Sequence, residues 1–190
     1  MLQTIKKLLG LNTPGPFLPP CPDVAFYAIG DVHGRLDLLD ELLENLDPGR
    51  SLVFVGDYVD RGEESAGVLR RLIKLCQEET RQVICLKGNH EDMLLQFLED
   101  PERYGPRWLQ YGGLQTLASF RISGMPPGAT PKALTKCRDA LLAEMGAELV
   151  EFLNRLLPSY LSGNVLVTHA GANPLLEPEY QIPSDLAWGH

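Results

Sequence analysis

The stretch "YAIGDVHGRLDLL", residues 27–39, decides the fold of this chain. An unbroken apolar run ends at Gly30, and leucines with helical spacing begin soon after it. Unbroken rather than alternating apolar residues are typical of a strand that is covered on both faces. Asp31 and His33 stand between the strand and the helix, two residues apart. The sequence therefore predicts a buried strand that delivers a carboxylate and an imidazole to the loop at its end.

Further apolar runs repeat this layout along the chain. The predicted buried strands are residues 24–29, 52–56, 82–88 and 164–170. Apolar stripes with helical spacing separate the first three strands, over residues 36–46 and 69–76. Because alternating strands and helices form βαβ units, we expect an α/β fold with a mixed, largely parallel sheet flanked by helices.

The pattern changes between residues 93 and 157. Leucine, tryptophan and phenylalanine recur at helical spacing there, and breakers such as "YGG" and "SGMPPGATP" interrupt them. This pattern predicts a helical insertion of three or four short helices. We expect the fourth strand to return to the sheet after this insertion.

Polar side chains follow every predicted strand. They are Asp31, His33, Asp57, Asp60, Asn89, His90 and His169. The carboxyl ends of parallel strands meet at one edge of a sheet, so we expect these side chains to converge. Carboxylate, amide and imidazole donors together form the ligand set of a divalent metal site. The number of donors favours two metals that share one carboxylate.

Four motifs in this order resemble a known family. They are "GDVHG" (30–34), "GDYVDRG" (56–62), "GNHE" (88–91) and "HAG" (169–171). The set is similar to the signatures of the calcineurin-like metallophosphoesterases. More narrowly, it resembles the compact bacterial and phage branch of the PPP-type serine/threonine protein phosphatases. The similarity runs from about Val24 to the last residue.

The resemblance implies a binuclear metal centre. Asp31 and His33 would hold the first metal, and Asp57 would bridge both metals. Asn89 and His169 would hold the second metal. The implied cofactors are two divalent ions, with Mn²⁺ expected and Fe or Zn as alternatives.

The resemblance also implies a reaction and its catalytic residues. The reaction is hydrolysis of phosphomonoesters, above all phosphoserine and phosphothreonine, by attack of a metal-bridging hydroxide. His90 would protonate the leaving alkoxide, Asp60 would orient His90, and Arg61 would bind the phosphoryl oxygens. Imidazole suits proton donation near neutral pH, and a planar guanidinium suits two phosphoryl oxygens.

Other interpretations stay open at this point. Asp60 and Arg61 are also compatible with a surface ion pair, and His90 with a structural role at a helix start. Glu91 and Asp92 are expected to be helix N-terminal charges rather than ligands. The alternative functions are a dinucleoside-polyphosphate hydrolase, of the bis(5'-nucleosyl)-tetraphosphatase kind, and an inactive metal-binding fragment.

The chain departs from the family pattern at its C-terminal end. The resemblance implies one more metal-binding histidine on a later strand, whereas this sequence ends at "DLAWGH". We therefore expect residues 23–190 to form a metallophosphoesterase domain without the family's C-terminal strands. Residues 1–22 are expected to form an N-terminal arm and a Pro-rich linker. Whether His190 replaces the missing histidine stays open.

Composition limits the partners and the location. The net charge of −8 argues against a general nucleic-acid binder, which needs a basic face. No run approaches 18 apolar residues, so no membrane span is expected. Cys76 and Cys85 fall in apolar patterns and are expected to be reduced core residues, which favours a cytoplasmic location. The expected partner is a phosphorylated protein or a small phosphoester.

Overall fold

A small parallel sheet forms the centre of the protein. The computed structural model describes residues 18–122 and 129–189. Strands β1 (Phe26–Ile29), β2 (Ser51–Phe54) and β3 (Val83–Cys85) lie in the order β1-β2-β3, and both pairings are parallel. The predicted α/β class with a parallel sheet flanked by helices is therefore confirmed.

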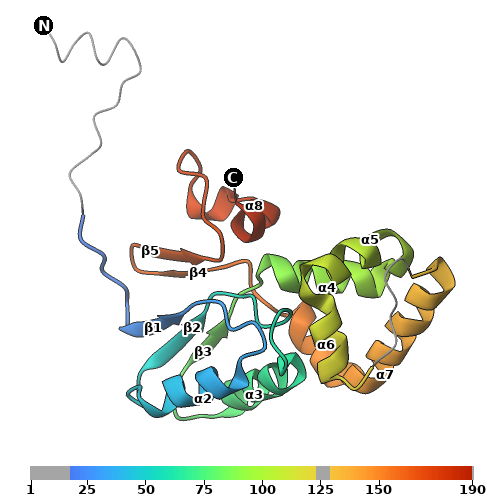
Figure 1. Cartoon of the computed structure of the whole chain (residues 1–190). Helices are drawn as coiled ribbons and strands as arrows, with labels where there is room; N and C mark the ends of the chain where they lie inside the picture. The colour runs from blue at the N-terminus through green and yellow to red at the C-terminus, as the bar shows by residue number, and fades with distance from the viewer. Residues whose placement is uncertain (1–17, 123–128, 190) are drawn as a thin grey trace, which may run out of the picture.

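Two amphipathic helices connect the three strands. Helix α2 (Leu36–Glu44) follows β1, and helix α3 (Ser65–Gln77) follows β2, and both cover the same face of the sheet (Figure 1). Helix α2 buries Leu39 and Leu43, and α3 buries Leu69, Leu72 and Leu75. These leucines recur every three or four residues, so each helix presents one apolar stripe to the strands. Cys76 is the exception to the prediction, because it lies on the exposed side of α3.

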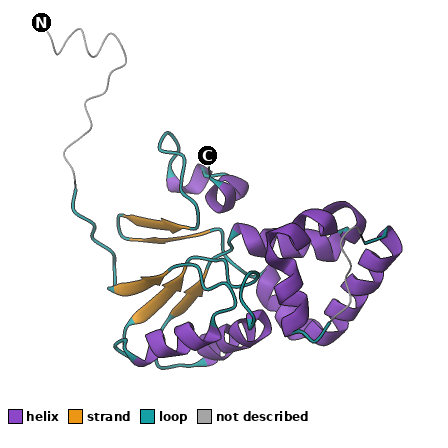
Figure 2. Ribbon diagram, viewed as in Figure 1, coloured by secondary structure: helices purple, strands orange, loops and turns teal. Residues whose placement is uncertain are grey.

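The helical segment forms a lobe beside the sheet (Figure 2). It contains α4 (Asn89–Glu99), α5 (Pro101–Trp108), the π-helix η1 (Leu109–Gly113), α6 (Leu114–Ser119) and α7 (Pro131–Asn154). Trp108 is fully buried in this lobe and stacks on Phe97, with the ring centroids 4.5 Å apart. Helix α4 begins at Asn89, four residues before the predicted start of the insertion. Its first turn therefore belongs to the edge of the sheet.

The predicted fourth strand pairs differently from the expectation. Strand β5 (Val165–Thr168) forms an antiparallel hairpin with β4 (Ser159–Ser162), which the sequence interpretation missed. In the described part of the chain, the hairpin is a separate two-stranded sheet, and a bridge between Leu86 and Leu157 links its approach to β3. The hairpin forms because Gly163 adopts a φ of 55°, which allows a two-residue turn to reverse the chain.

The segments at both ends of the described chain pack against this framework. The side chain of Asn164 bonds to the main chain of Pro19 and Cys21, which fixes the first described residues to the hairpin. After η2 (Pro178–Tyr180), helix α8 (Pro183–Trp188) reaches the helical lobe, where Trp188 Nε1 donates to Asp92 at 2.9 Å. Most of the predicted N-terminal arm lies outside the described residues, and so does His190. Among the described residues, no helix is both long and apolar enough to cross a membrane.

Candidate metal centre

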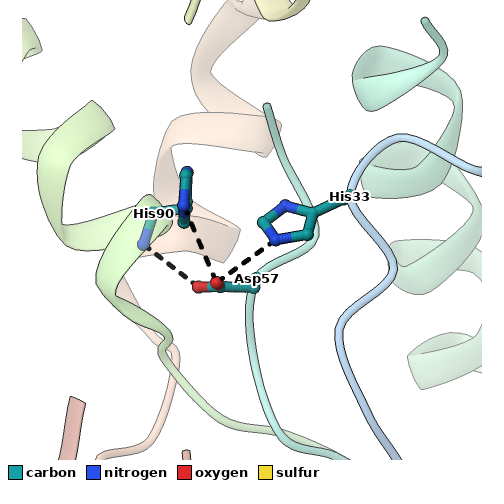
Figure 3. A group of neighbouring side chains, drawn as sticks. All are labelled: His33, Asp57 and His90. Atoms are coloured by element: carbon teal, nitrogen blue, oxygen red, sulfur yellow. Dashed lines mark hydrogen bonds and ion pairs between the residues drawn. The ribbon is translucent and has the colours of Figure 1, made fainter. Parts of the chain in front are cut away.

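The predicted site residues converge around Asp57 at the carboxyl end of the sheet. Four segments supply them: the loops after β1, β2 and β5, and the first turn of α4. His33 N donates to the main-chain oxygen of Asp57 at 2.8 Å, which joins the first loop to the second. Figure 3 shows the imidazoles of His33 and His90 on two sides of the Asp57 carboxylate. Asp57 is 3% exposed, so this carboxylate lies at the buried floor of the site.

His33 directs its Nε2 into the site. Its Nδ1 lies 2.8 Å from the carbonyl oxygen of Val59. A carbonyl only accepts, so Nδ1 carries a proton, and in the neutral imidazole Nε2 then keeps its lone pair. That Nε2 is buried without a hydrogen-bond partner, 3.5 Å from Asp57 Oδ2 and 3.8 Å from Asp31 Oδ2. Three electron-rich atoms that face each other with no proton between them favour a cation.

His169 repeats the arrangement on the other side of Asp57. Its Nδ1 donates to the carbonyl oxygen of Val55 at 3.0 Å, and in the neutral imidazole this again leaves Nε2 with its lone pair. Asn89 Oδ1 lies 3.0 Å from this Nε2, and Asp57 Oδ1 lies 3.4 Å from it. Main-chain carbonyls that fix the tautomer of an imidazole are the usual support of metal-binding histidines.

These contacts fit two cations that share one carboxylate. Asp57, His33 and His90 form one cluster, and Asp57, Asp31 and His169 form the other, with the ligand atoms of each cluster within 4.8 Å of one another. Asp57 belongs to both clusters, and its two oxygens face different histidines. The donor set of carboxylate, amide and imidazole suits divalent transition metals. The chain therefore brings together all five predicted ligands: Asp31, His33, Asp57, Asn89 and His169.

Glycines and one buried glutamate hold Asp57 in place. A Cβ at Gly88 would lie 2.1 Å from Asp57 Oδ1, so only glycine permits this approach. Asp57 has a φ of 57°, a conformation that costs energy in a non-glycine residue. Glu91 stabilises the turn by accepting hydrogen bonds from the main-chain N–H groups of Asp57 and Tyr58, both at 2.7 Å.

Glu91 is an acidic residue in the first turn of α4, as expected, and accepts a hydrogen bond from the main-chain N–H of Gly88 at 3.0 Å. The sequence did not indicate that Glu91 is also fully buried beneath the loop after β2. Burial raises the pKa of the Glu91 carboxyl to about 7, and the nearby Asp57 charge adds to the rise. The main-chain donors on Asp57, Tyr58 and Val59 act in the opposite direction, because they stabilise the carboxylate. Glu91 thus supports the loop that carries Asp57 by accepting hydrogen bonds from its main chain.

His90 has different partners from the other two histidines. Its Nδ1 lies 2.8 Å from Asp60 Oδ2, and its Nε2 lies 3.0 Å from Arg61 Nη2. Arginine only donates, so in this arrangement Nε2 accepts and Nδ1 carries the proton. His90 Nε2 is 3.9 Å from Asp57 Oδ2, and this nitrogen belongs to the candidate cluster of His33, Asp57 and His90. Asp60 is completely buried, which excludes the alternative of an Asp60–Arg61 surface ion pair.

The profile of one family matches most of the chain. Residues 24–186 match the calcineurin-like phosphoesterase profile. The chain belongs to this family. The resemblance that the four sequence motifs indicated is confirmed.

The curated relatives of this calcineurin-like phosphoesterase include tetraphosphatases and a protein phosphatase. The asymmetrical bis(5'-nucleosyl)-tetraphosphatase PrpE of Oceanobacillus iheyensis is 31% identical over 75% of this chain and 54% of its own length. A symmetrical bis(5'-nucleosyl)-tetraphosphatase of Pseudomonas fluorescens is 32% identical over 74% of this chain and 55% of its own length. Serine/threonine-protein phosphatase 2 of Escherichia coli is 39% identical over 46% of this chain and 38% of its own length. The chain thus spans about half the length, or less, of these relatives.

A solved structure supports the fold. The crystal structure of a putative diadenosine tetraphosphatase superposes with a TM-score of 0.56 and 22% identity, covering 88% of this chain and 63% of that one. This likeness supports the calcineurin-like architecture of the sheet and helices.

The structure adds residues to this phosphoesterase site that sequence reasoning missed. Trp108 Nε1 lies 3.1 Å from both carboxylate oxygens of Asp60, and Thr116 Oγ1 donates to Asp60 Oδ1 at 2.6 Å. The sequence analysis placed Trp108 only within the predicted helical insertion. Its apolar spacing gave no signal that one indole N–H and one hydroxyl meet a carboxylate 48 and 56 residues earlier in the chain.

Proposed function

We propose that the chain is a metal-dependent phosphatase that hydrolyses phosphomonoesters, with phosphoserine and phosphothreonine as its preferred substrates. The observation that carries this proposal is the buried pair of His90 and Asp60 at the candidate metal centre. An alkoxide is a strongly basic leaving group, so it departs efficiently only when an acid donates a proton to it. A phosphoanhydride has a weakly basic leaving group and depends less on such an acid.

The residues have separate tasks in this reaction. When bound, divalent cations supply an activated water and neutralise phosphoryl charge. Arg61 binds two phosphoryl oxygens through its planar guanidinium. When the guanidinium turns to the phosphoryl group, it no longer donates to His90 Nε2. Asp60 holds the Nδ1 proton and stabilises the positive imidazolium, so Nε2 can carry a second proton to the leaving oxygen.

The second candidate function is hydrolysis of dinucleoside polyphosphates. Its support is the name of two relatives that each align with about three quarters of this chain. The same metal cluster and the same Arg61 serve this reaction, because both reactions displace an oxygen at phosphorus. The two candidates therefore differ only in the leaving group and in the residues that contact the rest of the substrate.

A substrate panel separates the candidates. The purified chain with Mn²⁺ is assayed on a phosphoserine peptide, p-nitrophenyl phosphate and diadenosine tetraphosphate. We expect the highest kcat/KM on the peptide among the biological substrates. Higher kcat/KM on the tetraphosphate would support the second candidate. Metal binding without turnover of any substrate would support an inactive fragment. Asp57→Asn, purified in parallel, controls for contaminating phosphatases.

A further inference from the structure

The carboxylate of Asp60 is held mainly by the helical lobe. Both carboxylate oxygens accept from Trp108 Nε1, and Oδ1 also accepts from the hydroxyl of Thr116. The remaining hydrogen bond, which Oδ2 accepts from His90 Nδ1, is the one that orients the imidazole. We infer that Trp108 and Thr116 are positioning residues for His90, because they fix the Asp60 carboxylate in the orientation that binds Nδ1. The inference rests on the proposed function insofar as it assigns His90 as the acid.

The charge of Asp60 makes these donors important. Asp60 is fully buried, and among the described residues its carboxylate forms an ion pair only with His90. A buried carboxylate needs hydrogen-bond donors in place of water, and each lost donor leaves part of the charge unsatisfied. Without Trp108 or Thr116, the carboxylate gains freedom to rotate away from Nδ1. The imidazole then loses the partner that fixes its ring orientation and stabilises its positive charge.

The backbone at the same place is also held by the helical lobe. Asp60 and Arg61 have φ values of 71° and 67°, which are unfavourable for residues with a side chain. The main-chain N–H of Asp60 lies 2.9 Å from Thr116 Oγ1, and that of Arg61 lies 3.4 Å from the carbonyl oxygen of Gly112. Residues of the lobe therefore contact both the carboxylate of Asp60 and the strained backbone that presents it.

The π-helix η1 explains how two distant residues reach one carboxylate. Trp108 and Thr116 are eight residues apart, which corresponds to about 12 Å along a regular α-helix. At Gly112 the helix is broken by a φ of 112°, so α5 and α6 turn toward each other around Asp60. Irregular turns of this kind often occur at functional sites. The region from Trp108 to Thr116 is thus shaped around the Asp60–Arg61 turn.

Two near-isosteric substitutions test the inference. Trp108→Phe keeps an aromatic ring against Phe97 and removes the N–H donor, and Thr116→Val keeps the shape and removes the hydroxyl. For O-phosphoserine we expect kcat to fall about tenfold to a hundredfold in each variant, the size expected for a lost hydrogen bond to a charged group. KM should stay within about twofold, since neither residue is proposed to contact substrate. For p-nitrophenyl phosphate, kcat should change by less than about threefold, because that leaving group departs without a proton.

Matched variants distinguish positioning from general damage. Thr116→Ser retains the hydroxyl and should restore most of the phosphoserine activity. Trp188→Phe removes the other indole N–H of the chain, which donates to Asp92 rather than to Asp60, and should show no selective loss. Equal losses on the two substrates, a fall in metal content, or failure of Thr116→Ser to restore activity would show a structural role and overturn the inference.

A second measurement does not depend on turnover. The Nδ1 proton of His90 is buried in a hydrogen bond to a fixed carboxylate, so it should exchange slowly with solvent in NMR spectra of ¹⁵N-histidine-labelled protein. In Trp108→Phe and Thr116→Val this proton should exchange at least about tenfold faster, with the Nδ1 protons of His33 and His169 as internal references. Unchanged exchange would overturn the inference. A wild type that hydrolyses neither monoester would instead contradict the proposed function, and the NMR result would still decide the positioning role.

Discussion

Three histidines of this site differ in the groups that accept their Nδ1 protons. Main-chain carbonyls accept from His33 and His169, and in the neutral imidazole this leaves the Nε2 lone pair facing the cluster around Asp57. The carboxylate of Asp60 accepts from His90, and a carboxylate stabilises an imidazolium. At the scale of single residues, these different partners are consistent with the proposed roles of His33 and His169 as metal ligands and of His90 as an acid.

The shared carboxylate gives the first prediction. Asp57→Asn should abolish hydrolysis of every substrate and lower the bound metal per chain, because one neutral amide does not bridge two dications. Metal content is measured by elemental analysis after dialysis. Asp139→Asn makes the same change of charge on an exposed residue of α7 and should leave metal content and activity unchanged. Full activity in Asp57→Asn would contradict the assignment of Asp57 as the bridge.

The acid gives the second prediction. His90→Asn should keep metal content near that of the wild type, since His90 Nδ1 and Nε2 already bind Asp60 and Arg61. Turnover of phosphoserine should fall by roughly 10²–10⁴, the usual contribution of a general acid. The loss for p-nitrophenyl phosphate should be smaller. Equal losses on both substrates, or loss of metal, would identify His90 as a ligand, as its place in the cluster with His33 also permits.

At the scale of helices and strands, the convergence of the candidate metal ligands could be predicted and the support of Asp60 could not. Each candidate ligand directly follows an apolar run or begins the next helix. Because the carboxyl ends of parallel strands lie at one edge of the sheet, these residues are expected to converge. Trp108 and Thr116 reach Asp60 through a break in a helix, and helical spacing carries no information about such a break. The sequence analysis also missed β4, and with it the antiparallel hairpin that β4 forms with β5.

The π-helix η1 gives the third prediction. Gly112→Ala should destabilise the protein by about 1–3 kcal/mol, because alanine is strained at a φ of 112°. It should also lower activity, since the new Cβ would lie 2.6 Å from the main-chain nitrogen of Arg61. Gly49→Ala is the control, as its Cβ would meet only a side-chain oxygen at 3.6 Å. Chemical denaturation and kcat for phosphoserine are measured for both, and an unaffected Gly112→Ala would show that η1 does not constrain Arg61.

At the scale of the whole molecule, the site lies where two parts of the protein meet. The loops of the sheet supply most of the candidate metal ligands, and the helical lobe supplies the groups that hold Asp60 and Arg61. Helix α4 belongs to both, because its first turn carries Asn89 and His90 while its later residues pack inside the lobe. A sequence read element by element predicts each part. It does not predict how the parts dock, since docking depends on contacts between residues that are far apart in the chain.

Segments far apart in the chain meet at this junction, so metal binding should depend on the folded state. This dependence gives the last prediction. The lone pairs of His33 and His169 face carboxylate oxygens, so a bound cation relieves an unfavourable arrangement that exists only in the folded state. Free Mn²⁺ at 100 times its Kd would stabilise the fold by about 2.7 kcal/mol. For a chain of this size that corresponds to a rise in Tm of roughly 5–10 °C. Thermal melts with increasing Mn²⁺ and then with excess chelator should show this rise and its reversal in the wild type, and a much smaller rise in Asp57→Asn. An equal rise in both proteins would place the bound metal elsewhere on the surface and would contradict the proposed centre.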